Sequence, residues 1–134
     1  MTGLVVKLNP KERLLINGAV LENSDKRCKL TILSKDSRVL RLKDAIDPVI
    51  ANTPVKRAIC FTQFLIVDTR DSMERECRVL RELAQLATVF EGTIGSDIIS
   101  DARKSLRAGN TYGCLKLLRT LLPLEHQMLS GSHV

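Results

Sequence analysis

The chain has 134 residues, of which 44% are apolar and 27% charged, as in an ordinary folded protein of one core or two small modules. The net charge of +6 predicts attraction to polyanions, and no apolar run approaches the roughly 20 residues of a membrane span. The four cysteines form no CxxC pair and both histidines lie near the C-terminus, which argues against a metal site and predicts buried free thiols in the cytoplasm.

The first 47 residues alternate apolar and polar side chains with a period of two, which predicts about five short β-strands. Asn17-Gly18 lies between two apolar runs and predicts a tight hairpin, because both central residues of a type I′ turn need positive φ. Residues expected to face the core from three of the strands are Leu4, Val6, Leu8, Cys28, Leu30, Ile32, Leu40 and Leu42.

The polar positions of these strands are mostly basic, with ten Lys or Arg against six Asp or Glu. If the last two strands pair through a turn at Ser34–Ser37, their cations share one sheet face, and an anion would relieve the repulsion. A solvated outer face that carries charge for solubility fits the spacing equally well. No aromatic residue lies in this part, so base stacking is not expected here. The candidate binding residues are Lys7, Arg13, Arg27, Lys29, Arg41 and Lys43.

From Thr53 onward the pattern becomes helical. Thr53 is the expected N-cap of a helix with Pro54 first, and the apolar run from 58 to 67 predicts a central, buried helix. Asp71 and Glu74 have the spacing of a capping box and open a second helix that runs to about Phe90. Its apolar seam is expected at Met73, Cys77, Leu80, Ala84 and Ala87, widened by Val79, Leu83, Leu86 and Phe90.

The charged face of this second helix includes an expected Glu74–Arg78 ion pair. It is interpreted as solvated, with the docking of a partner helix as the alternative. The candidate docking residues are Arg75, Arg78, Arg81 and Glu82.

Two shorter helices are expected after the second one. The first begins at Ser96 and ends near Gly109, and the last begins at Thr111 and is stopped by Pro123. A second, weaker basic cluster lies on these helices at Arg103, Lys104, Arg107, Lys116 and Arg119.

These patterns predict an α+β fold with four segments. Residues 1–47 form a small basic antiparallel β module, 48–53 a connector, 54–126 a helical bundle and 127–134 a frayed tail. The sequence contains no catalytic set, P-loop or dinucleotide fingerprint, so neither an enzyme nor a cofactor is expected.

Four sequence segments, in this order, resemble the flagellar-biosynthesis repressor FlbT family of alphaproteobacteria over essentially the whole chain. They are KLNPKERLLINGAV, RLKD, TPVKR with FTQFL, and LRAGNTYGCLKLLRTLLP. Two residues depart from the family's pattern: Leu42 stands where an acidic residue is frequent, and Cys114 where alanine is frequent.

The resemblance implies a post-transcriptional regulator that binds the 5′ untranslated region of flagellin messenger RNA and represses translation. It also implies the helical flagellar protein FlaF as a partner, and a homodimer is left open. The alternative is a protein-interaction adaptor, or a chaperone-like flagellar assembly factor, acting through the helical half. The strand half alone resembles, at the level of fold, the dimeric RNA-binding carbon storage regulator, with Lys7 and Arg41 as positional counterparts.

Overall fold

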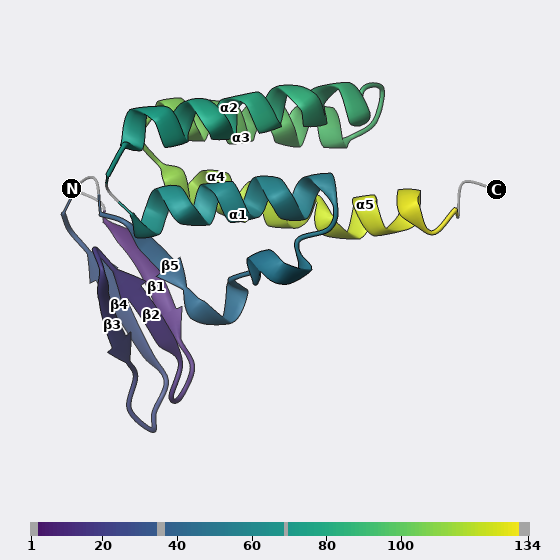
Figure 1. Ribbon diagram of the computed structural model, residues 1–134. Coiled ribbons are helices and arrows are strands. Elements are labelled where there is room, and N and C mark those ends of the chain that lie inside the picture. The colour runs from purple at the N-terminus through teal and green to yellow at the C-terminus, as the bar shows by residue number, and fades with distance from the viewer. Residues whose placement is uncertain (1–2, 35–36, 69, 132–134) are drawn as a thin grey trace.

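The computed structural model describes residues 3–34, 37–68 and 70–131. Within these residues five strands precede five α-helices (Figure 1), so the expected α+β fold is confirmed. The strands are β1 (Leu4–Leu8), β2 (Arg13–Ile16), β3 (Ala19–Glu22), β4 (Cys28–Ile32) and β5 (Val39–Arg41). Two 3-10 turns, η1 (Leu42–Asp44) and η2 (Pro48–Ile50), lead to α1 (Pro54–Val67), α2 (Ser72–Val89), α3 (Gly95–Arg107), α4 (Thr111–Thr120) and α5 (Leu122–Leu129).

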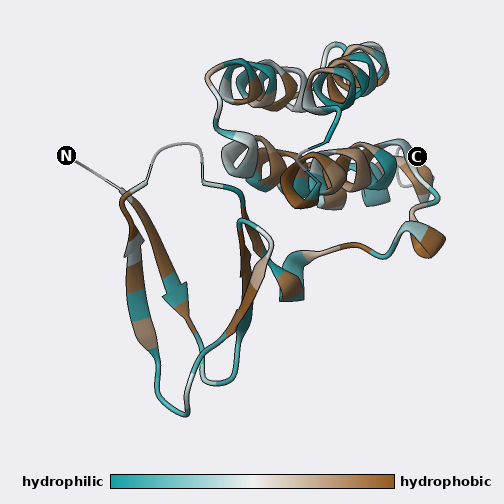
Figure 2. Cartoon of the chain, turned by 60° about the vertical axis from the view of Figure 1, so that its left-hand side comes forward, coloured by the Kyte–Doolittle hydropathy of each residue, from teal (hydrophilic) through white to brown (hydrophobic). Residues whose placement is uncertain are grey.

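The strands form two antiparallel sheets, β1-β4 and β3-β2-β5. The expected pairing of the last two strands is therefore wrong, since β4 pairs with β1 and β5 pairs with β2. This arrangement lets the two sheets face each other (Figure 2) and share a small core. Its fully buried members are Val6, Leu8, Leu14 and Val39.

The helices cover the β2 and β5 part of the second sheet on its other side, whereas β3 is exposed. Leu15 and Leu40 belong to the helical core, so β2 and β5 are buried on both faces. The alternation expected to continue to Leu42 and Lys43 is wrong, because β5 ends at Arg41 and the chain turns into η1. The inward positions of β1 and β4 follow the expected alternation.

The hairpin between β2 and β3 is confirmed, with φ of 50° at Asn17 and 88° at Gly18. The Asn17 side chain also accepts a 2.7 Å hydrogen bond from the backbone N–H of Arg38. One turn residue therefore closes the hairpin and holds the start of β5 beside it.

Helix α1 begins as expected, with the Thr53 hydroxyl accepting a hydrogen bond from the N–H of Lys56. Its side chains are buried almost all round, and Val55, Ala58 and Ile59 are completely inaccessible to solvent. Helix α1 packs against α2, α4 and α5 and is the centre of the core.

The seam expected on α2 is confirmed only for the four residues that were expected to widen it, and it is wrong for the others. Val79, Leu83, Leu86 and Phe90 are the buried residues, whereas Met73 is 82% exposed and the other members of the expected seam are exposed or half-buried. The helix carries two apolar stripes on neighbouring sides, and only one meets α1 and α3. The capping box is absent too, because Asp71 has φ of 53° and its side chain caps nothing.

The last helices also begin differently from expectation. The N-cap position of α3 is occupied by Ile94 in place of Ser96, and the hydroxyl of Thr93 accepts a 3.1 Å hydrogen bond from the N–H of Gly95. Pro123 lies in the first turn of α5, where a missing N–H costs nothing, so it opens a further helix that continues to Leu129. No helix in the described part of the chain is long and apolar enough to cross a membrane.

Candidate functional site

Three of the six candidate basic residues lie together on the sheet of β1 and β4. Lys7 is directly opposite Lys29 in the register of the two strands, and both side chains are exposed. Arg27 immediately precedes β4 and is also exposed. These three cations line a shallow hollow of about 470 Å³, and none forms an ion pair with another described residue.

Two like charges directly opposite each other destabilise a β pair. Lys7 and Lys29 occupy such a pair next to a third cation, so their repulsion opposes folding in the free protein. A bound phosphate would reverse the sign of this interaction, because it places a negative charge between the ammonium groups. The three cations are therefore a candidate anion site, which we call the β1–β4 basic face.

Arg41 has a different, structural role. Its guanidinium donates to both carboxylate oxygens of Glu12, at 2.7 and 2.8 Å, and its Nη2 donates to the carbonyl of Lys7 at 2.6 Å. Only 4% of the Glu12 side chain is exposed, and one of its oxygens also accepts from the N–H of Asn9. Arg41 thus joins β5 to β1 and satisfies a buried carboxylate.

The hydrogen bonds from Arg41 lower the pKa of Glu12 to about 2, against the opposing effect of burial. The same contact raises the pKa of Arg41. Lys43 Nζ lies 3.9 Å from the same carboxylate, and Arg13 forms an exposed 3.1 Å ion pair with Glu22 on β3. Arg13 therefore pairs with Glu22, and Arg41 and Lys43 share the single carboxylate of Glu12, which offsets one of their two charges. The expected common face of Arg41 and Lys43 with Arg27 and Lys29 does not form, because β4 and β5 are not neighbours.

The weaker basic cluster is divided as well. Lys116 and Arg119 of α4 line a hollow of about 340 Å³ together with Tyr112, Arg41 and Asp44, whereas the three cations of α3 are exposed elsewhere. Lys116 lies 5.7 Å from the Tyr112 ring, and Arg119 is 3.6 Å from Asp44. The neighbouring residues Val5 and Val6 of β1 complete this hollow, so β1 connects it to the β1–β4 basic face. The sequence alone did not indicate that Tyr112 meets the β module.

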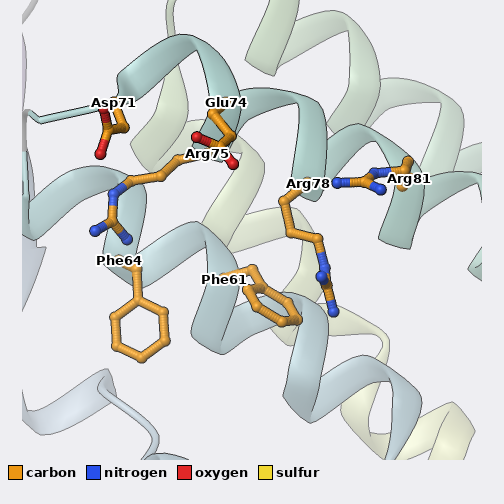
Figure 3. Close-up of a pocket in the computed structure, with 7 residues that line it drawn as sticks. All are labelled: Phe61, Phe64, Asp71, Glu74, Arg75, Arg78 and Arg81. Atoms are coloured by element: carbon orange, nitrogen blue, oxygen red, sulfur yellow. The ribbon is translucent and has the colours of Figure 1, made fainter.

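Three of the four candidate docking residues, Arg75, Arg78 and Arg81, line a groove of about 300 Å³ between α1 and α2 (Figure 3). Arg78 stacks 4.3 Å above the ring of Phe61, which also contacts Phe64 edge to face. Arg78 pairs with Glu82 at 3.3 Å, so the expected pair with Glu74 is not formed. The structure adds two exposed or half-buried aromatic rings to the charged residues that the sequence identified.

Comparison with known proteins agrees with the residues quoted above. The sequence model of a family described as "Flagellar protein FlbT" matches residues 4–129. The chain belongs to the FlbT family. No solved protein structure matches it.

Similar members of the FlbT family carry the name of a repressor. The chain is 32% identical to a probable flagellum biosynthesis repressor protein FlbT of Rhodopseudomonas palustris, over 95% of this chain and 98% of that protein. It is 33% identical to the protein of that name from Caulobacter sp. strain K31, over 94% and 95%. The flagellum biosynthesis repressor protein FlbT of Caulobacter vibrioides strain CB 15 is 28% identical, over 94% and 89%.

The cysteines of this FlbT-family chain are free thiols with different environments. Cys60 and Cys114 are buried, and burial raises the pKa of Cys114 to about 12. Cys28 is half-buried, but Cys77 is exposed on α2, so the expectation of four buried thiols is wrong. The exposed thiol belongs to the apolar stripe of α2 that does not meet the core.

Proposed function

We propose that this chain represses flagellin synthesis by binding the 5′ untranslated region of flagellin messenger RNA through the β1–β4 basic face. The observation that carries this proposal is the register of Lys7 opposite Lys29, two exposed cations without a carboxylate partner among the described residues. The relatives named flagellum biosynthesis repressor support repression as the outcome.

The chemistry of the face suits a phosphate backbone. Lysine ammonium groups bind phosphate oxygens as point charges, and Arg27 offers a planar fork of donors at the same hollow. An RNA strand that continues across β1 reaches Lys116 and Tyr112 at the neighbouring hollow. An RNA leader held along this path is covered by protein, which blocks the ribosome sterically.

The variant Lys7→Ala/Lys29→Ala tests the site. We expect it to bind a flagellin leader RNA about tenfold more weakly at low salt, because two phosphate contacts are lost. The slope of log K against the logarithm of the salt concentration should become less negative by about 1.5–2. Equilibrium binding at several salt concentrations measures both quantities.

Stability and a matched control separate this loss from misfolding. Removing two repelling charges should leave the free energy of unfolding unchanged or slightly higher. The control Lys11→Ala/Arg13→Ala removes the same charge from two exposed ion pairs, with Asp25 and Glu22, and should change affinity much less. Equal losses of affinity in both variants would show non-specific attraction and refute the site.

The groove between α1 and α2 favours a second function, an adaptor that binds the helical protein FlaF. Aromatic and arginine side chains are the residues that anchor protein interfaces, and Phe64 is 39% exposed beside Arg78 and Arg81. Phe64→Glu should reduce co-purification with FlaF at least about tenfold, because it places a charge at the apolar anchor. RNA affinity should be unchanged. Undiminished co-purification would exclude the groove as the FlaF site.

A further inference from the structure

Helix α2 presents an apolar stripe that the described chain leaves largely uncovered. Met73 is 82% exposed, Cys77, Ala84 and Ala87 are exposed, and Leu80 is half-buried. Helix α2 lies at the outer edge of the helical layer, above α1 and in front of α3 in Figure 1. The side of α2 that bears the stripe is therefore open to another molecule.

The spacing of the stripe is that of a helix-pairing seam. Its members follow each other at intervals of four, three, four and three residues, which is the heptad pattern of coiled coils. The core-facing residues of the same helix, among them Val79, Leu83 and Leu86, form a separate stripe. One helix thus carries a seam for its own core and a second seam without a partner.

The stripe is complementary in side-chain size to a second, antiparallel copy of itself. In an antiparallel pair of α2 helices, Met73 lies opposite Ala84 of the second copy, and Cys77 opposite Leu80 of the second copy. Each contact joins a large side chain to a smaller one, so the helices can approach to the usual 8–10 Å. Self-complementarity of this kind is what a two-fold interface requires.

The charges beside the stripe fit the same arrangement. Glu74 follows Met73 and Arg81 follows Leu80, so both charges lie on one side of the stripe, at its border with the groove between α1 and α2, which they also line. Neither forms an ion pair with another described residue. In the antiparallel pair this side of the stripe on one helix faces the same side on the other. Glu74 of each copy then lies near Arg81 of the other copy, which gives two attractive pairs.

We propose that two copies of this chain associate through antiparallel α2 helices about a two-fold axis, with Glu74 of each copy facing Arg81 of the other. One helix pair buries less than a standard interface, so the dimer forms in a concentration-dependent manner. The association leaves the β1–β4 basic face of each copy open (Figure 1), and the dimer therefore carries two such faces.

Charge reversal tests the proposal without altering the core, because both residues are exposed. In Glu74→Arg, both interface positions of each copy are positive, and in Arg81→Glu both are negative. Each variant alone should self-associate at least about tenfold more weakly in sedimentation velocity at low salt. An equimolar mixture of the two should form a heterodimer, because every facing pair is then attractive.

Two further variants complete the test. The double variant Glu74→Arg/Arg81→Glu restores opposite charges and should dimerise like the wild type. Asp25→Arg, in the loop between β3 and β4, makes the same charge change as Glu74→Arg and should leave dimerisation intact. The labelling rate of Cys77 should fall as wild-type concentration rises, but not in Glu74→Arg. A monomeric wild type throughout, or a dimer indifferent to these reversals, overturns the proposal.

Discussion

Replacing Glu12 by alanine is expected to lower the free energy of unfolding by about 2–4 kcal/mol. The change removes both carboxylate acceptors of Arg41, whose side chain is only 19% exposed, and the acceptor of the Asn9 N–H. Arg41 would then be half-desolvated without a counter-charge, while its contact with the Lys7 carbonyl remains. Urea unfolding followed by circular dichroism measures the loss.

The control for this variant is Glu22→Ala, which breaks the exposed pair with Arg13. Both side chains of that pair are exposed to solvent, so its loss should lower the free energy of unfolding by about 0.5 kcal/mol or less. A Glu12→Ala protein as stable as Glu22→Ala would mean that the buried pair adds nothing to the fold. Arg41→Ala, which leaves the Glu12 carboxylate without its main partner, should be at least as destabilising as Glu12→Ala.

The Glu12–Arg41 pair also predicts a pH dependence. The pKa of Glu12 is about 2 in the folded protein against 4.5 for the unperturbed group, so the folded state favours the ionised form. The resulting stabilisation is complete above pH 4.5 and disappears as the pH falls towards 2. The difference in unfolding free energy between wild type and Glu12→Gln should therefore be constant near neutrality and shrink in this acid range.

Local chemistry explains which parts of the fold were predictable. Asn17-Gly18 and Thr53-Pro54 act through their own backbone preferences, and both form the expected turn and helix start. The partner of β4 depends instead on which apolar faces meet across the whole module. Alternation within β4 is the same whether it pairs with β5 or with β1, so the sequence pattern could not decide.

The same distinction applies to the site. Lys7 and Lys29 could be assigned to exposed strand faces by alternation, and they are exposed. The burial of Glu12 could not be predicted, because its partner Arg41 is 29 residues away and depends on the β2–β5 pairing. On α2, both stripes have helical spacing, and packing against α1 and α3 selects the one that is buried.

The second large effect concerns Glu125, a carboxylate of α5 that is only 6% exposed. It accepts a 2.8 Å hydrogen bond from the N–H of Val55 and a 2.5 Å hydrogen bond from the hydroxyl of Thr53. A negative charge therefore lies at the N-terminus of the central helix α1, where the free N–H groups and the helix dipole favour it. These hydrogen bonds also connect α5 to the start of α1.

Glu125→Ala should lower the free energy of unfolding by about 2–4 kcal/mol, because it leaves the buried Val55 N–H without an acceptor and removes the charge. Glu125→Gln retains one carbonyl acceptor and should lose about half as much. Exposed Glu91, on the loop after α2, is the control, and Glu91→Ala should change stability by less than about 0.5 kcal/mol. Hydrogen exchange adds a local measurement, since the Val55 amide should exchange faster in Glu125→Ala. Unchanged protection of that amide would mean that α1 is capped without α5.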